Sequence, residues 1–117
     1  YVSKEVMDQR LEWYIKSLFE HYMGKDSKYK DLFYGWDVVN EACSDSTAQV
    51  YRADKGGNDK LTDSTHSNKS SWWHVYQSNE FIINAFKYAN KYAPADVELY
   101  YNDYNDSWPV FAHFSRL

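Results

Sequence analysis

The feature that most constrains this chain is a short apolar run that ends in two polar side chains. Residues 32–42 read LFYGWDVVNEA, and beyond Asp37 the run stays apolar until Asn40 and Glu41. A short and nearly continuous apolar segment is typical of a strand that is covered on both faces of a parallel sheet. Strands of this kind present reactive groups at their carboxyl ends. We therefore predict a strand over 32–42 that places an amide and a carboxylate side by side.

Helical patterns flank this run on both sides. A capping residue, Ser3, and a terminating glycine, Gly24, bound an amphipathic pattern that predicts a helix over 1–24. A second apolar face predicts a helix over 78–94, where Pro94 ends it. The apolar face of the first helix is formed by Met7, Leu11, Tyr14, Ile15, Leu18 and Tyr22.

A second strand is predicted over 96–105, where the apolar residues of VELYY are followed by the polar sequence NDYN. Both strands would run in the same direction, so the chain between them must cross over the sheet. This order of helices and strands predicts an α/β fold.

Two segments show no sustained periodicity. Residues 43–77 are rich in Ser, Thr, Asp, Asn and Lys and predict a long loop, which either faces a substrate or is a solvated excursion that touches nothing. Trp72 and Trp73, near its end, either line a cleft or pack against the strand ends. Residues 106–117 fit a final helix that begins near Pro109, or a rearranged end of the chain.

The composition narrows the classes of partner. A net charge of -4 without a Lys/Arg cluster argues against nucleic acid and anionic membrane surfaces, and no stretch is apolar enough to span a membrane. Aromatic residues make up 20% of the chain. Their flat apolar faces can lie against the C–H faces of sugars, or they can simply fill a core.

Nothing in the sequence predicts a metal or a cofactor. The single cysteine, Cys43, excludes an internal disulfide and a cysteine-based metal site. The histidines lack the spacing of metal ligands, and they are His21, His66, His74 and His113.

Two motifs resemble those of the glycoside hydrolase family 10 endo-1,4-beta-xylanases. Residues 36–42 read WDVVNEA, and residues 99–105 read LYYNDYN after an Ala85-Phe86 pair. The resemblance covers most of the chain and implies a (β/α)8 TIM barrel. A complete barrel takes about 250 residues, and this chain has 117. We therefore expect a segment of a barrel, with a helix, the acid/base strand, a long loop, a second helix and the next strand.

The resemblance also implies roles for individual residues in the hydrolysis of β-1,4-xylan with retention of configuration. Glu41 would be the general acid and then the general base, Asn40 would bond the 2-hydroxyl of the sugar, and Tyr104 would offer its ring to the sugar on the leaving-group side. A bond to the 2-hydroxyl strengthens as the oxocarbenium-like transition state forms. The supporting residues would be Trp36, Asp37, Asn102 and Asp103.

Retaining hydrolysis needs a second carboxylate roughly 5 to 5.5 Å from the first. In the family this nucleophile lies on a later strand, which the chain does not contain. Asp37 lies four residues before Glu41, about 13 Å along an extended strand, and the family pattern assigns Asp103 to a supporting role. We therefore expect the chain alone to be inactive.

The expected partners are xylan or a xylo-oligosaccharide and the remainder of the barrel, in the same parent chain, as a complementing fragment or in an oligomer. The resemblance implies an extracellular, secreted protein, and residues 1–4 are not a signal peptide. Two alternatives stay open. The chain is an aromatic-rich carbohydrate-binding module without catalytic activity, or it is a truncation product that folds only beside the missing barrel. The second alternative follows because two strands with open edges make a poor independent domain.

Overall fold

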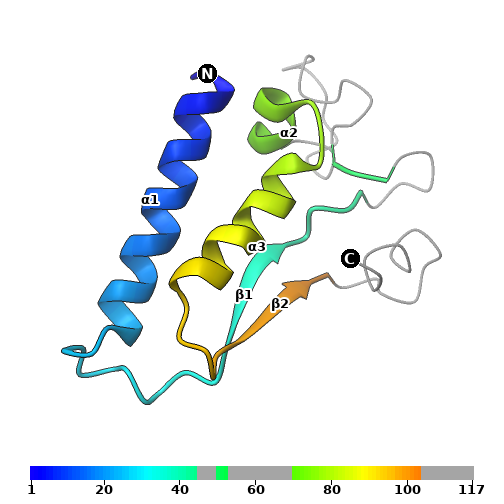
Figure 1. Cartoon of the computed structure of the whole chain (residues 1–117). Coiled ribbons are helices and arrows are strands. Elements are labelled where there is room, and N and C mark those ends of the chain that lie inside the picture. The colour runs from blue at the N-terminus through cyan, green and yellow to red at the C-terminus, as the bar shows by residue number, and fades with distance from the viewer. Residues whose placement is uncertain (45–49, 53–69, 104–117) are drawn as a thin grey trace.

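The computed structural model describes residues 1–44, 50–52 and 70–103, and it contains a two-stranded parallel sheet with helices beside it (Figure 1). The elements in chain order are α1 (Lys4–Met23), β1 (Gly35–Asn40), α2 (Ser71–Tyr76), α3 (Glu80–Tyr92) and β2 (Glu98–Asn102). Both strands fall within the ranges expected for them, and their predicted parallel pairing is confirmed. The expected tail 106–117 lies outside the described residues.

The first helix begins and ends where its sequence signals indicate. Ser3 caps α1, because its Oγ accepts a hydrogen bond from the backbone N–H of Val6 at 3.3 Å. At Gly24 the backbone has an ordinary φ of -61°, so the left-handed conformation that favours glycine is not the reason for its presence. A Cβ at this position would collide with the carbonyl oxygen of Glu20. Close approach of the backbone therefore requires the glycine.

The core lies between α1, α3 and the sheet. α3 lies between α1 and the strands (Figure 1) and contacts all three elements. Its small residues Ala85 and Ala89 are buried in one cluster with residues of α1. The buried positions of α1 follow a spacing of four residues and are Leu11, Ile15, Phe19 and Met23. Tyr14, which the sequence pattern assigned to the apolar face, is 57% exposed. In the part of the chain that the structure describes, no helix has the length and apolarity to cross a membrane.

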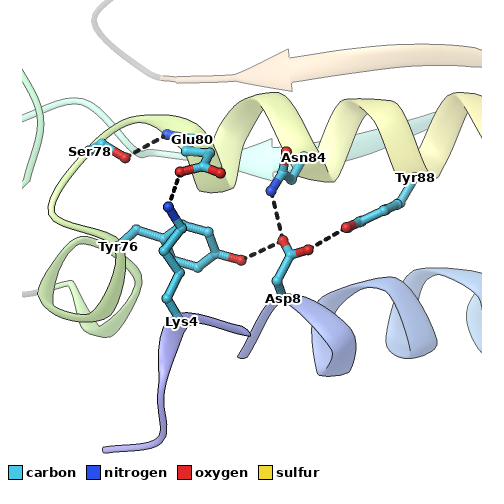
Figure 2. Close-up of polar contacts among 7 residues, drawn as sticks. All are labelled: Lys4, Asp8, Tyr76, Ser78, Glu80, Asn84 and Tyr88. Atoms are coloured by element: carbon cyan, nitrogen blue, oxygen red, sulfur yellow. Dashed lines mark hydrogen bonds and ion pairs between the residues drawn. The ribbon is translucent and has the colours of Figure 1, made fainter. Parts of the chain in front are cut away.

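A carboxylate on α1 joins the helices through a cluster of hydrogen bonds, which we call the Asp8 cluster (Asp8, Tyr76, Asn84 and Tyr88; Figure 2). Asp8 Oδ1 accepts hydrogen bonds from the Tyr76 hydroxyl and the Asn84 amide, both at 2.7 Å, and Oδ2 accepts one from the Tyr88 hydroxyl. Burial raises the pKa of Asp8, but these three hydrogen bonds outweigh burial and hold it below the ordinary value of 3.8.

A short helix interrupts the long loop expected over 43–77. α2 is capped by Ser70, whose Oγ accepts a hydrogen bond from the Trp73 N–H at 3.2 Å. The expectation of an unstructured loop is wrong at this point, because six residues are too few for periodicity to reveal and packing decides their conformation. Trp72 stacks on Phe81 at 6.3 Å between ring centroids, and Trp73 stacks on Tyr51 at 5.1 Å. Both tryptophans pack against other aromatic rings of the chain, and Trp72 also lines a pocket that reaches the end of β1.

Candidate active site at the carboxyl ends of the strands

The parallel pairing brings the two sequence motifs to one edge of the sheet. Asn40, the last residue of β1, lies opposite Asn102, the last residue of β2, and the Asn102 amide donates a hydrogen bond to Asn40 Oδ1. Glu41 and Asp103 directly follow these asparagines. The Glu41 N–H also donates a hydrogen bond to the Asn102 carbonyl oxygen at 2.8 Å. Predicted site residues that are 61 positions apart (Glu41 and Asn102) thus lie side by side.

Glu41 has an unusual backbone conformation. Its φ is 52°, in the left-handed region, which costs a residue with a side chain roughly 1–2 kcal/mol. Conformations of this kind persist where the surroundings hold them, and they are concentrated at functional sites. The Glu41 side chain is 43% exposed, so its carboxylate is open to solvent and to a ligand.

Arg52 contacts both the backbone carbonyl and the carboxylate of Glu41. Arg52 Nε donates a hydrogen bond to the Glu41 carbonyl oxygen at 2.6 Å, and its guanidinium lies 3.9 Å from Glu41 Oε2. Arg52 reaches this position because the chain folds back on the end of β1. The Ser44 N–H donates a hydrogen bond to the Val50 carbonyl at 2.9 Å, and the Arg52 N–H donates one to the Ala42 carbonyl at 3.0 Å. Its side chain is 14% exposed, so the contact is largely shielded from bulk water.

The hydroxyl of Tyr101 holds the backbone that follows Glu41. It accepts hydrogen bonds from the N–H groups of Ala42 at 3.1 Å and Cys43 at 3.2 Å. It donates one hydrogen bond to Asp103 Oδ2 at 2.7 Å. Burial, followed by the contacts of the hydroxyl with the Cys43 side chain and with Asp103, raises the pKa of Tyr101 well above its ordinary value of 10.0, so the phenol stays protonated.

The other predicted site residues lie farther from the strand end or outside the described part of the chain. Trp36 packs among aromatic rings, with centroids 5.6 Å from Phe19 and 5.5 Å from Phe33, and it also lines the pocket that reaches the strand end. Asp37 is exposed in the middle of β1 and lies opposite Tyr100. Tyr104 lies outside the described residues.

Sequence reasoning missed Arg52 and Tyr101. Arg52 lies in a segment without periodicity, and no local signal indicates that the chain folds back there. Tyr101 reads as one apolar residue of a strand; its place directly before the polar NDYN residues was the available hint. Among the described residues, no group of three or more His, Cys, Asp or Glu side chains could hold a metal ion.

A pocket of about 560 Å³ lies between α1, β1 and α3 and reaches the strand end. Glu41 and Arg52 line it together with serine residues that precede and begin α2. Most of its lining is apolar and combines aliphatic side chains with aromatic rings, which are those of Tyr14, Phe19, Trp36, Trp72 and Phe81. The pocket therefore offers apolar surface that further protein can cover, and aromatic faces beside polar groups that can contact a sugar.

Comparison with known proteins identifies the family. The profile of glycosyl hydrolase family 10 matches residues 1–113. Endo-1,4-beta-xylanase Y of Acetivibrio thermocellus is 45% identical over 109 residues, and the bifunctional endo-1,4-beta-xylanase of Ruminococcus flavefaciens is 41% identical over 111 residues. These matches cover 92% and 94% of this chain but 10% of each relative. The chain thus spans about a tenth of the length of these curated relatives.

Solved structures give the same result. An endo-1,4-beta-D-xylanase 10B of Clostridium thermocellum, in complex with xylohexaose, matches 97% of this chain with 40% identity and a TM-score of 0.73, over 21% of its own chain. A psychrophilic family 10 endo-beta-1,4-xylanase matches 96% of this chain with 33% identity and a TM-score of 0.62, over 28% of its own chain. The described fold is a mixed α/β fragment that matches part of these TIM-barrel structures. The chain belongs to glycosyl hydrolase family 10.

Proposed function

We propose that Glu41 is the general acid, and then the general base, of an endo-1,4-beta-xylanase that cleaves β-1,4-xylan with retention of configuration. The observation that carries the proposal is the placement of the WDVVNEA glutamate at the carboxyl edge of a parallel sheet, next to the second family motif. Active sites of α/β barrels lie at this edge. Relatives crystallised with xylohexaose and with xylotriose support xylan as the class of substrate.

The neighbouring residues receive the roles that the family pattern suggests. Asn40 would donate a hydrogen bond to the 2-hydroxyl of the sugar, and its amide is held by the bond from Asn102. Tyr104 would offer an aromatic face to the sugar on the leaving-group side. Asn102 and Asp103 would support the strand end, since both take part in hydrogen bonds there.

The nucleophile would come from the remainder of the barrel. Retention requires a second carboxylate roughly 5 to 5.5 Å from the acid. Two observations support a larger parent structure. The chain matches 21% and 28% of two solved relatives. Among the described residues, β1 pairs with β2 on one side, and a mostly apolar pocket lies between α1, β1 and α3. Further barrel strands would cover this apolar surface.

The experiment uses the parent chain with its complete barrel. We expect Glu41→Gln to lower kcat/KM for xylan by about 10²- to 10⁴-fold, the usual contribution of general acid catalysis. For a xylobioside with a dinitrophenyl leaving group, kcat/KM should fall far less, because that leaving group departs without protonation. Glu20→Gln, on the solvent face of α1, is the control and should behave as the parent. Full xylanase activity of Glu41→Gln, or xylan retention without cleavage by the parent, would refute the proposal.

A further inference from the structure

We propose that Tyr101 is a positioning residue, which aims the Glu41 carboxylate through two backbone hydrogen bonds. The inference rests on the proposed function of Glu41 and extends it to a residue in the neighbouring strand. Tyr101 touches the backbone directly after Glu41, and its hydroxyl is fixed by Asp103.

The backbone of Glu41 is held on three sides. Its N–H is bonded to the Asn102 carbonyl, and its carbonyl receives the Arg52 Nε–H. The two peptide N–H groups that follow, of Ala42 and Cys43, converge on the single hydroxyl oxygen of Tyr101. A φ of 52° turns the chain sharply at Glu41, and the direction of this turn decides where the side chain points.

The Tyr101 hydroxyl is suited to positioning because its own orientation is set. Both of its lone pairs accept backbone N–H groups, and its proton is donated to Asp103 Oδ2 at 2.7 Å. Asp103, in the family motif NDYN, therefore acts on Glu41 through two intermediates. It orients the phenol, the phenol orients the turn, and the turn orients Glu41. The contacts of the phenol with Asp103 and with the turn are hydrogen bonds of ordinary length.

A packing role can be separated from this positioning role. The Tyr101 ring is half-buried in β2, and phenylalanine would keep the ring contacts while it removes the hydroxyl. Without the hydroxyl, the Ala42 and Cys43 N–H groups lose their acceptor, and the turn at Glu41 can relax. A displacement of about 1 Å at a catalytic group can cost about 10²-fold in rate. The loss should affect proton transfer specifically.

The test compares leaving groups in the parent chain with its complete barrel. Values of kcat/KM are measured for xylan and for a series of aryl xylobiosides whose leaving groups range from good (nitrophenols) to poor (phenol). We expect Tyr101→Phe to lower kcat/KM for poor leaving groups and for xylan by about 10- to 100-fold, and to leave that for the dinitrophenyl substrate within about 3-fold. Tyr100→Phe, on the same strand and 41% exposed, is the matched control and should behave as the parent.

The outcomes separate the two proposals. If Glu41→Gln shows the leaving-group dependence while Tyr101→Phe loses activity equally on all substrates, or loses none, the proposed function stands and the positioning role is overturned. If Glu41→Gln shows no such dependence, the proposed function fails and the inference fails with it. If Tyr101→Phe does not fold, Asp103→Asn is used in its place, because that change keeps the Tyr101 ring and weakens the orientation of its hydroxyl. We expect kcat/KM for poor leaving groups to fall in the same way but by less. An unchanged kcat/KM for these substrates would overturn the inference.

Discussion

Replacement of Asp8 by alanine should destabilise the helical layer by about 3 kcal/mol. Hydrogen bonds to a charged group contribute about 1.5–3 kcal/mol each. The Tyr76 side chain is buried at 5% exposure, so its hydroxyl cannot regain a water molecule, and we assign it about 1.5 kcal/mol. Asn84 and Tyr88 are more accessible and can bond to water, so we assign each about half of that value.

The measurement is urea unfolding of the parent protein, followed by far-UV circular dichroism, with the free energy of unfolding extrapolated to water. The matched control is Glu20→Ala on the same helix, whose carboxylate is 65% exposed and lies 3.8 Å from Lys16. An exposed pair of this kind contributes at most about 0.5–1 kcal/mol. If Asp8→Ala costs no more than the control, the Asp8 cluster does not stabilise the fold as argued.

The same replacement predicts a pH dependence of known sign. The folded state holds the pKa of Asp8 below its ordinary value of 3.8. The stabilisation is therefore fully present above the unfolded pKa and is lost as the pH falls through the lower pKa of the folded state. The difference in unfolding free energy between the parent and Asp8→Ala should shrink as the pH falls below about 4. A difference that stays constant down to pH about 2 would contradict the assignment.

Two further predictions concern single residues. Cys43 is fully buried, and burial raises the pKa of its thiol to about 11. Ellman's reagent at neutral pH should therefore label Cys43 in the denatured protein and leave it largely unlabelled in the folded protein. Rapid labelling of the folded protein would refute this prediction. Gly24→Ala should cost about 1–2 kcal/mol of stability, because the new Cβ meets the Glu20 carbonyl oxygen. An unchanged unfolding midpoint for Gly24→Ala would show that the helix end tolerates the Cβ.

The order of the elements was readable from local patterns. The apolar stretches around 35–40 and 98–102 are short and bounded by polar residues, and the α1 and α3 segments carry helical periodicity. The cap at Ser3 was predictable for the same reason, since a capping side chain bonds an N–H three residues away. Local signals of this kind failed for α2, whose six residues are too few to show a period and whose Trp72 packs on Phe81.

The contacts that hold the site could not be derived from local patterns. Tyr101 and Ala42 are 59 positions apart, and Tyr88 and Asp8 are 80 apart. Whether such groups meet depends on the strand register and on the angle at which the helices pack. The bulge between Asp37 and Val39 shifts the register, so the exact partner of each residue in β2 does not follow from counting along the sequence.

The sequence by itself determined the family, the order of the elements and the identity of the candidate acid, because a motif is a local property of consecutive residues. Tertiary structure decided how Glu41 is held. The left-handed turn at Glu41, the arginine that folds back onto its carbonyl oxygen and the phenol that binds the next two N–H groups all depend on the placement of distant segments. Chemistry at a strand end is thus encoded by neighbouring residues, whereas its orientation is set by hydrogen bonds that only the folded chain can form.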